Sequence, residues 1–419
     1  MQNVVITGMG IVSSLGFDVD RFFARVLSGE VAIHPAPWTS EAGAVWWSGV
    51  RDFEPAQWVS PLVESGTDLY AQFTLAAAEQ SVRRSGIRFD PVRTAIVHGT
   101  TLGGVRALMR AQYELERGGP AAIDRKALIM VPPNMPAAQL AMRWDLHGPQ
   151  LTLTTACASA LDAIGTAARM IADGRADSAI AGGTEGGWAG AGGSAEGDFS
   201  PAVFHSQISY GMIVPGADRS VASVPFDRRR NGIVTGEGSA MFVLEREESA
   251  RARGAAVLAE ITGYASLADA YHPSSPEPTG RWEAEVMRQA LGDAALCPNE
   301  VDALIAHATS TPKGDSAEIR AINAVHSRDR RTPLPAMSLK GHIGHSGAAA
   351  GAMSLVAALF TLSEGVLPHT AGTRDVDPEA DFSVITERPL ALDAHIIQLN
   401  AFGFGGQNAS LIVRRGRSR

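Results

Sequence analysis

The sequence predicts an α/β fold built from parallel layers, and two observations lead to this prediction. Short β-rich runs alternate with helical stretches, which is the order expected when strands and helices form parallel layers. The second observation is internal similarity, because Ala-Ile-Val-His-Gly-Thr-Thr at 95–101 resembles Leu-Ile-Ala-His-Ala-Thr-Ser at 304–310. We therefore predict two similar halves, 1–250 and 251–419.

The expected strands and helices follow one another in a regular order. β-rich runs occupy residues 4–7, 94–97, 151–153 and 178–181, and helical patterns occupy residues 69–85 and 158–171. In the second half, an Ala-rich helix is expected at 348–359, and the glycine-rich stretch 403–406 resembles 179–183. Each half is therefore expected to place a reactive turn before an Ala-rich helix.

Composition sets the class of protein. A chain of 419 residues with 45% apolar residues can bury a core larger than one domain usually holds. The net charge of −8 gives a nucleic-acid partner no electrostatic support. Two cysteines make neither a disulfide framework nor a metal cluster. With no leader and no apolar run approaching membrane-spanning length, we expect a cytoplasmic protein without a membrane partner.

Cys157, in Thr-Thr-Ala-Cys-Ala-Ser-Ala, is a candidate nucleophile. It lies where the apolar run 151–153 gives way to the helical pattern, so we expect its thiol at a helix start. Unpaired N–H groups and the helix dipole there favour the thiolate, the form of sulfur that attacks carbonyl carbon. A single cysteine in an apolar stretch is more often a small buried hydrophobic residue, so its role depends on other residues.

Two histidines occur downstream, each in a small-residue turn after an apolar segment. His307 lies in Ala-His-Ala-Thr-Ser-Thr-Pro, and His345 lies in Gly-His-Ile-Gly-His-Ser-Gly. Loops at strand ends carry the chemistry of open α/β sheets, so both rings could meet Cys157 in one cleft. Either histidine could instead be part of the scaffold, but Lys340 and Glu318 close by in sequence favour a charged site.

Three other motifs give little evidence for a function. Gly8-Met9-Gly10 suggests a dinucleotide loop, but Ser13 stands where the third glycine belongs, so we predict no nicotinamide cofactor. His98 follows a strand and is expected to be structural. The arginines at 228–230 are expected on a solvated surface, with an acidic partner protein as the alternative contact.

Ordered motifs along nearly the whole chain resemble one family. They are Val-Val-Ile-Thr-Gly-Met-Gly at 4–10, the Cys157 segment, Ala-Gly-Gly-Thr-Glu at 181–185, Pro-Phe-Asp at 225–227, Gly-Glu-Gly at 236–238, the two histidine motifs, and Asn-Ala-Phe-Gly-Phe-Gly-Gly-Gln-Asn at 400–408. The chain thereby resembles the β-ketoacyl-acyl-carrier-protein synthases, or ketosynthases, of the thiolase superfamily. The resemblance implies a five-layered αβαβα thiolase-like fold, usually dimeric, with the active site between the halves.

The resemblance also implies the chemistry. Cys157 would take an acyl group from the phosphopantetheine arm of an acyl carrier protein. The backbone amides of Cys157 and Phe404 would form the oxyanion hole. His307 and His345 would stabilise the enolate formed when a malonyl thioester loses carbon dioxide. No cofactor would be bound by the enzyme itself.

Other residues take roles by the same resemblance. Lys340 and Glu318 would belong to a charge network that orients the histidines. Thr309 and Thr311 would hydrogen-bond the pantetheine arm, although short hydroxyls in a turn could equally be local caps. The remaining residues expected at the substrate site are Phe402, Phe404 and Ile233.

The sequence departs from the family pattern at Ala308, Asn231, Ile233 and Gln407, and these departures leave the acyl chain undetermined. Residues 186–224, which carry Trp188, Phe199, Phe204 and Tyr210, look longer than the family segment and are predicted to be a partner or pocket insertion. Polyketide rather than fatty-acid assembly is favoured.

Alternative identities within the superfamily are weaker. A non-catalytic chain-length-factor-like subunit generally lacks the cysteine, although a heterodimer with such a subunit stays as open as a homodimer. A thiolase would need a second cysteine near the C-terminus, where this chain has none.

Overall fold

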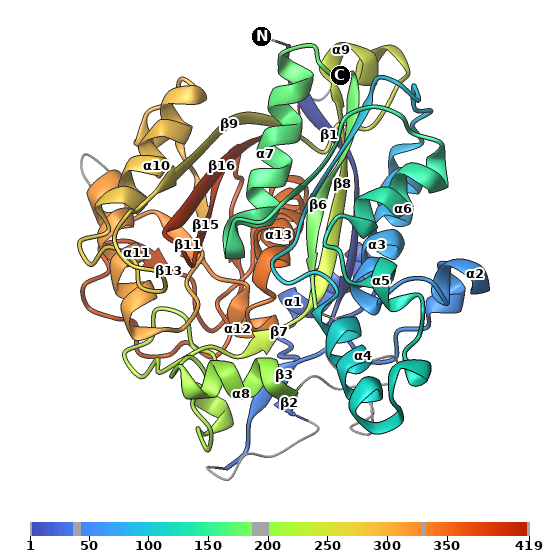
Figure 1. Ribbon diagram of the computed structural model, residues 1–419. Helices are drawn as coiled ribbons and strands as arrows, with labels where there is room; N and C mark the ends of the chain where they lie inside the picture. The colour runs from blue at the N-terminus through green and yellow to red at the C-terminus, as the bar shows by residue number, and fades with distance from the viewer. Residues whose placement is uncertain (1, 37–42, 187–200, 328–331, 417–419) are drawn as a thin grey trace.

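One large sheet runs through the protein. The computed structural model describes residues 2–36, 43–186, 201–327 and 332–416 (Figure 1). The strand order of its 11-stranded sheet is β13-β11-β10-β15-β16-β9-β1-β8-β6-β4-β5. The strands are β1 (Val4–Ser13), β4 (Thr94–Gly99), β5 (Gln150–Leu153), β6 (Ser178–Glu185), β8 (Gly238–Arg246), β9 (Ala259–Ala268), β10 (Ala303–Ile305), β11 (Pro335–Met337), β13 (Ser383–Val384), β15 (Ile396–Gly403) and β16 (Gln407–Arg415).

The strand order contains the same pattern twice. The first half runs β5-β4-β6-β8-β1 and the second runs β11-β10-β15-β16-β9. Pairing directions also repeat, because β4 is parallel to β5 and β6 just as β10 is parallel to β11 and β15, while β8 and β16 are antiparallel to their neighbours. The two similar halves are therefore confirmed. Their sheets join where β1 pairs with β9, Val4 opposite Ile261.

Helices complete five layers. Figure 1 shows, from left to right, α10 and α11, the strands of the second half, α7 and α13, the strands of the first half, and α3 and α6. The longer helices are α1 (Val19–Leu27), α3 (Leu69–Ser85), α4 (Val105–Gly118), α6 (Met135–Trp144), α7 (Ser159–Ala172), α8 (Pro201–Ser209), α10 (Arg281–Asp293), α11 (Pro312–His326) and α13 (Ala350–Glu364). The central α13 is buried around most of its circumference, as a helix between two sheets must be. The predicted αβαβα fold is confirmed.

Short elements lie around these layers. They are the helices α2 (Pro61–Glu64), α5 (Ala127–Met130), α9 (Glu247–Ala252) and α12 (Lys340–Ile343) and the strands β2 (His34–Pro35), β3 (Trp46–Ser48), β7 (Thr235–Gly236), β12 (Val366–Leu367) and β14 (Leu390–Ala391). The predicted boundary at 250/251 falls inside α9, whereas the repeat begins again at β9. That boundary stays a prediction.

The Gly8-Met9-Gly10 motif lies inside β1, not in a phosphate-binding loop. A Cβ on Gly8 would lie 2.0 Å from the carbonyl oxygen of Ser81, and one on Gly10 would lie 2.0 Å from that of Ala77. Both carbonyls belong to α3, so the glycines let this helix pack directly on the strand. Their spacing is explained by packing.

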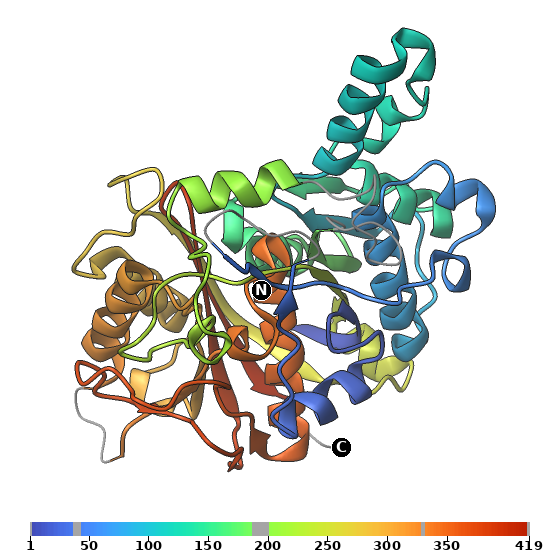
Figure 2. The same ribbon diagram turned by 90° about the horizontal axis from the view of Figure 1, so that it is seen from below.

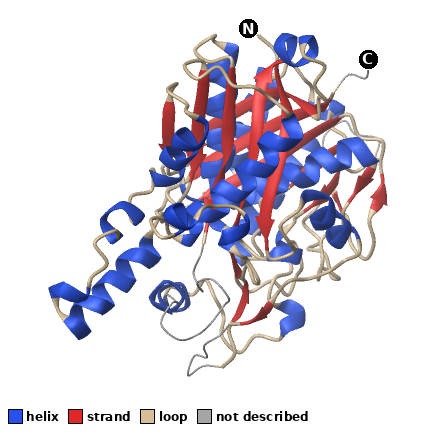
Figure 3. Ribbon diagram, turned by 90° about the vertical axis from the view of Figure 1, so that its right-hand side faces the viewer, coloured by secondary structure: helices blue, strands red, loops and turns tan. Residues whose placement is uncertain are grey.

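A helical arm formed by α4 and α5 projects from the first half, as Figures 2 and 3 show. Its root is fixed by Tyr70 of α3, whose hydroxyl donates to the carbonyl of Pro132 at 2.9 Å. Asp68, the N-cap of α3, accepts the N–H of Ala107 in α4 at 3.1 Å. The arm is therefore anchored at its base and solvent-facing along its length.

One helical stretch, Gly347–Glu364, is long and apolar enough to cross a membrane by length and composition alone. The sequence-based expectation that no stretch approaches this length was therefore wrong. In the fold, 83% of that stretch is buried inside the protein, where it forms the central helix between the sheets. The apolar composition is accounted for by its place in the core.

Candidate active site

The nucleophilic turn connects β5 to α7. Cys157 lies in a 3₁₀ turn, Ala156–Ala158, directly before α7. Ala156 has a φ of 50°, a left-handed conformation that residues with a Cβ rarely adopt. The chain therefore bends sharply here and presents the thiol at the end of the strand. Cys157 is partly exposed.

Both predicted histidines reach the sulfur. His345 Nε2 lies 3.0 Å from Cys157 Sγ, and the ring centroids of His307 and His345 are 5.3 Å apart. Ligating atoms of the three side chains all lie within 4.8 Å of one another. Residues separated by up to 188 positions are thus brought into one small volume between the two halves.

The thiol does not have the low pKa expected of a helix start. Burial raises the pKa of Cys157 to about 11, although the Lys340 ammonium lowers it and the backbone N–H groups of Phe404 and Cys157 lower it further. The amides at the helix start thus favour the thiolate, as expected, but desolvation of the anion outweighs them and the net pKa is raised. The two amides expected to form the oxyanion hole do both approach the sulfur.

The two imidazoles are neutral near pH 7. Burial and the nearby Lys340 charge hold the pKa of His307 and of His345 well below its usual range. A neutral imidazole has one N–H donor and one nitrogen acceptor. Each ring can therefore donate one hydrogen bond to a developing oxyanion without itself carrying charge.

Lys340 and Glu318 hold the backbone of His307 and not its ring. Glu318 accepts the N–H of His307 at 2.8 Å and that of Ala308 at 2.6 Å. The Lys340 ammonium donates to the carbonyl oxygen of His307. Both side chains are buried, with exposed fractions of 1% for Glu318 and 3% for Lys340. Burial lowers the pKa of Lys340 to about 8.

Two buried acids at the site had no role in the sequence analysis. Glu185 accepts the N–H groups of Thr101 at 2.9 Å and Ala348 at 3.3 Å, and its charge raises the pKa of Cys157. Asp315 accepts the N–H of Phe226 at 2.8 Å, and burial raises its pKa to about 7. The sequence could have indicated Glu185 as a site residue, because it is an acidic residue at the end of an apolar strand.

The glycine-rich loop lies against the nucleophilic turn. A Cβ on Gly403 would lie 2.9 Å from the backbone nitrogen of Cys157. Gly405 and Gly406 have left-handed φ values of 78° and 71°. Both conformations favour glycine, so this stretch can bring the Phe404 amide close to the sulfur.

The predicted substrate-binding residues lie at different distances from the histidines. The Phe402 ring centroid is 5.8 Å from that of His307. Thr309 and Thr311 hydrogen-bond each other at 3.0 Å, and Thr311 caps α11, so the local-cap alternative is observed for Thr311. Ile233 packs in an apolar cluster with Phe204, one residue before Val234, whose carbonyl accepts the His345 N–H at 2.7 Å.

The arginines at 228–230 do not form a free basic patch. Arg230 is 7% exposed and pairs with Asp377 at 2.8 Å. Arg229 pairs with Asp227 at 2.7 Å, and both Arg228 and Arg229 are exposed, as expected of a solvated surface. The acidic-partner alternative for this stretch stays a prediction.

Residues 187–200 of the segment predicted as an insertion, including Trp188 and Phe199, lie outside the described residues. Its helix α8 buries Phe204 against Trp47, with ring centroids 6.4 Å apart. Farther on, the exposed Tyr210 lies 6.5 Å from the Phe404 ring, centroid to centroid. The described part thus reaches the oxyanion loop.

Sulfur and imidazole nitrogen are also zinc ligands, and the spacing within 4.8 Å could accommodate an ion. The buried Lys340 ammonium beside all three side chains opposes a second cation, because its charge already lowers their pKa values. We therefore propose catalysis without a metal, and the positive charge of Lys340 at the site supports this proposal.

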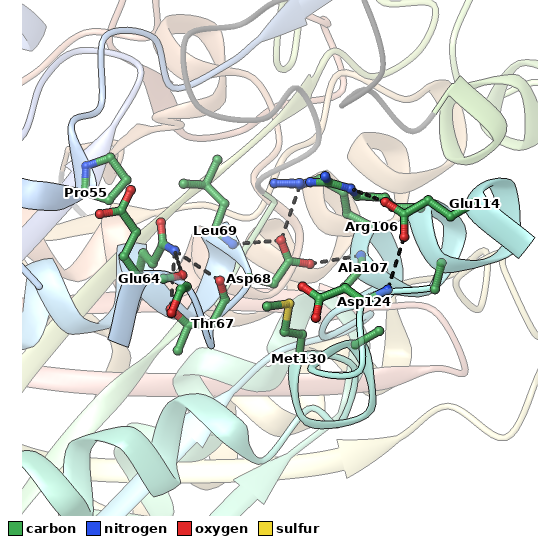
Figure 4. A pocket seen from close by; sticks show the side chains of 15 residues that line it. Pro55, Glu64, Thr67, Asp68, Leu69, Arg106, Ala107, Glu114, Asp124 and Met130 are labelled. Carbon is green, nitrogen blue, oxygen red and sulfur yellow. Dashed lines mark hydrogen bonds and ion pairs between the residues drawn. The ribbon is translucent and has the colours of Figure 1, made fainter. Parts of the chain in front are cut away.

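A cavity of about 410 Å³ lies elsewhere, at the root of the arm (Figure 4). It is lined by Asp68, Arg106, Glu114 and Asp124 among others, and Asp68 pairs with Arg106 at 3.3 Å. Neither Cys157 nor the two histidines line it. This cavity is therefore distinct from the catalytic candidates.

Family models match most of the chain. Residues 1–250 match the model described as "Beta-ketoacyl synthase, N-terminal domain", and residues 258–374 match "Beta-ketoacyl synthase, C-terminal domain".

Individual proteins are similar over nearly their whole length. A 3-oxoacyl-[acyl-carrier-protein] synthase 2 from Coxiella burnetii is 32% identical, covering 99% of each chain. A putative polyketide beta-ketoacyl synthase 1 from Streptomyces cyaneus is 34% identical, covering 98% of each. Among solved structures, the ishigamide ketosynthase/chain length factor matches with a TM-score of 0.89 at 30% identity, covering 99% of this chain and 100% of that one.

Proposed function

The chain belongs to the β-ketoacyl synthase family, and on this premise we propose how its residues carry out decarboxylative condensation. It is an acyltransferase, an elongating β-ketoacyl-acyl-carrier-protein synthase of fatty-acid or polyketide assembly. The observation that carries the residue assignment is the contact of His345 Nε2 with Cys157 Sγ at 3.0 Å, with the His307 ring beside it.

The first step is acyl transfer to Cys157. Its sulfur attacks the thioester carbonyl of an acyl carrier, the bond from that carbonyl to the carrier sulfur breaks, and the thiol proton ends on the carrier sulfur. Because burial raises the pKa of the thiol, the proton leaves as the attack proceeds and not long before it. The amides of Cys157 and Phe404 stabilise the oxyanion.

The second step forms the carbon–carbon bond. A malonyl carrier thioester loses carbon dioxide, and its thioester oxygen carries the enolate charge. His307 and His345 donate hydrogen bonds to that oxygen, and Lys340 and Glu318 keep His307 in place. The carbanion attacks the acyl-cysteine carbonyl, the carbon–sulfur bond to Cys157 breaks, and a β-ketoacyl carrier thioester leaves.

Two variants test this division of labour. Cys157→Ala should abolish the intact-mass increase that the protein gains from an acyl carrier, and a persistent increase would remove Cys157 from its role. His307→Ala should retain that increase but slow malonyl decarboxylation about 100- to 1,000-fold, the usual effect of losing one oxyanion donor. Normal condensation by His307→Ala would contradict the proposal.

We further propose an acyl carrier protein as the partner that delivers both substrates on phosphopantetheine. The similarity to a 3-oxoacyl-[acyl-carrier-protein] synthase supports this partner. The hydroxyls of Thr309 and Thr311 lie in the turn that leads from His307 into α11, where they could accept the arm while capping the helix. Loss of carrier affinity in Thr309→Val, with acylation by a small thioester retained, would test this role.

A dimer is proposed from the exposed apolar surface of the first half. The edge strand β5 and the arm side carry Leu102, Leu108, Tyr113, Leu128, Ile129, Met142 and Leu151, each at least 39% exposed. Such patches and free strand edges are typical of protein interfaces. Sedimentation of the purified chain distinguishes a homodimer from a monomer that awaits a different subunit.

Polyketide assembly stays the favoured pathway, supported by the similarity to the Streptomyces cyaneus protein but not distinguished from fatty-acid assembly. The alternative of a non-catalytic subunit is disfavoured because Cys157, His307 and His345 meet in one site. If the purified chain fails to condense alone but condenses with a chain-length-factor-like partner, this chain is the active half of a heterodimer. We also propose a cytoplasmic location, in keeping with two unpaired cysteines.

A further inference from the structure

Asp162 is a buried carboxylate that has no part in the mechanism above. It lies in the first turn of α7 and is 4% exposed. Its Oδ2 accepts the Thr155 hydroxyl at 2.5 Å, and its Oδ1 accepts the Tyr264 hydroxyl at 2.7 Å. Hydroxyls thus approach it from the nucleophilic turn on one side and from β9 on the other. Burying a carboxylate costs free energy, because the group loses its hydration, unless hydrogen-bond donors such as these replace the lost water.

The Thr155 contact fixes the start of the nucleophilic turn. Thr155 is two residues before Cys157, and the residue between them, Ala156, has the left-handed φ of 50°. A residue in that conformation persists only when surrounding contacts hold it. Ser159, the first residue of α7, also holds the turn, because its Oγ accepts the Thr155 N–H at 2.9 Å and donates to the Ala156 carbonyl at 2.6 Å. Asp162 supplies a contact from the helix that follows.

The Tyr264 contact extends this support to the second half. Tyr264 belongs to β9, and its ring lies so close to α7 that a Cβ on Gly165 would come within 2.3 Å of it. Burial raises the pKa of Tyr264, so its hydroxyl stays protonated as a donor. β9 pairs with β16, and β16 pairs with β15, the strand that ends at Gly403 directly before Phe404. Figure 1 shows α7 lying between this group of strands and β6.

These contacts join the two donors of the oxyanion hole. The Cys157 amide comes from the first half, and the Phe404 amide comes from the second. Their separation depends on how the nucleophilic turn is held against the sheet of the second half. Asp162 hydrogen-bonds both the turn and that sheet, so it bridges the elements on which the two amides are carried.

We propose that Asp162 is a positioning residue that keeps the Cys157 amide and sulfur in register with the Phe404 amide. The expected effect of Asp162 on condensation rests on the proposed function, whereas its expected effect on the ionisation of the Cys157 thiol does not. If the turn relaxes, the sulfur moves away from the Phe404 N–H, which then no longer stabilises the thiolate. The thiolate fraction at a given pH then falls.

Alkylation of Cys157 by iodoacetamide tests the proposal without any substrate. Cys297 is the other cysteine of the chain, so Cys297→Ser serves as the background and peptide mass spectrometry identifies the product. Asp162→Asn and Thr155→Val should each slow alkylation of Cys157 about tenfold and move its pH midpoint upward, since a hydrogen bond to a charged group is lost. Thr155→Ser, which keeps the hydroxyl, should restore the wild-type rate.

Two comparisons separate positioning from general destabilisation. Thr155→Val combined with Asp162→Asn should slow alkylation no more than the stronger of the two changes alone, because both act on the same contact between Thr155 and Asp162. Thr94→Val is the control in another part of the fold, because it also removes a threonine hydroxyl that hydrogen-bonds an aspartate, here the Asp90 carbonyl at 2.7 Å, and Ser178 at 2.9 Å. It should lower the melting temperature and leave alkylation unchanged.

Acyl transfer provides the linked measurement. Asp162→Asn should lower kcat for acylation about tenfold and leave KM for the carrier unchanged, since no carrier-binding residue is altered. Unchanged or faster alkylation in both single variants, or effects that multiply in the double variant, would overturn the proposal. If the wild type accepts no acyl group from any carrier, the proposed function fails, and the alkylation series still decides the role of Asp162.

Discussion

Removing the Glu318 carboxylate should destabilise the protein and displace His307. Its two oxygens accept the N–H groups of His307 and Ala308 at 2.8 and 2.6 Å, and the residue is 1% exposed. A buried donor left without an acceptor costs about 1 to 3 kcal/mol, so Glu318→Ala should lower the free energy of unfolding by about 2 to 6 kcal/mol. Glu318→Gln keeps one acceptor oxygen and should lose about half as much.

The two effects are separated by assay. Chemical denaturation measures the free energy of unfolding, carbon dioxide release from a malonyl carrier measures decarboxylation, and intact mass measures acylation of Cys157. Glu318→Gln should slow decarboxylation more than acylation, because it moves the backbone of His307 and not that of Cys157. Glu283→Gln is the matched control, since Glu283 is 2% exposed and one of its carboxylate oxygens has no partner among the described residues. If Glu318→Ala is as stable as the wild type and decarboxylates normally, the positioning role is wrong.

Three further predictions concern charge, pH and metals. Lys340→Met should slow alkylation of Cys157 at about pH 7, where the Lys340 ammonium is charged, because a cation that favours the thiolate is lost. An unchanged alkylation rate at that pH would contradict this. Burial lowers the pKa of His98 to about 3, so below about pH 6.5 only the unfolded chain takes up a proton at this residue. The free energy of unfolding of the wild type should therefore fall by about 1.4 kcal/mol per pH unit relative to that of His98→Asn. Parallel denaturation curves at about pH 7 and about pH 5 measure the difference, and a constant difference would refute it. Dialysis against EDTA should leave acylation of Cys157 unchanged. If dialysis instead abolishes acylation and only added zinc restores it, the cluster of Cys157, His307 and His345 holds a metal.

Local signals were sufficient for some elements and not for others. The helix predicted at 69–85 is α3, Leu69–Ser85, because Asp68 caps its start and Gly86 ends it in a left-handed conformation. β1 extends to Ser13, beyond the predicted end at residue 7. The glycines that interrupt its β pattern are required by α3 packing on the strand, a tertiary contact that strand propensity does not encode.

The thiol illustrates a second limit. The sequence correctly located Cys157 between a strand and a helix, where helix dipole and free amides favour the anion. The balance between those amides and desolvation depends on how deeply the sulfur is buried, and here burial prevails. Similarly, Lys340 and Glu318 were predicted beside the histidines, but only the fold shows that both side chains hydrogen-bond to the backbone of His307.

The sequence by itself determined the family, the duplicated α/β architecture and the three reactive side chains, because these are properties of residue identity and order. It predicted a structural role for His98 and a catalytic role for His307, although their local sequences are alike, His98 near the end of β4 and His307 two residues after β10. The tertiary structure decides, because His98 is fully enclosed and hydrogen-bonded to Thr74, whereas the His307 ring lies beside His345 and the sulfur. Reactivity depends on which groups share a small volume, and that is set by how the two halves pack together.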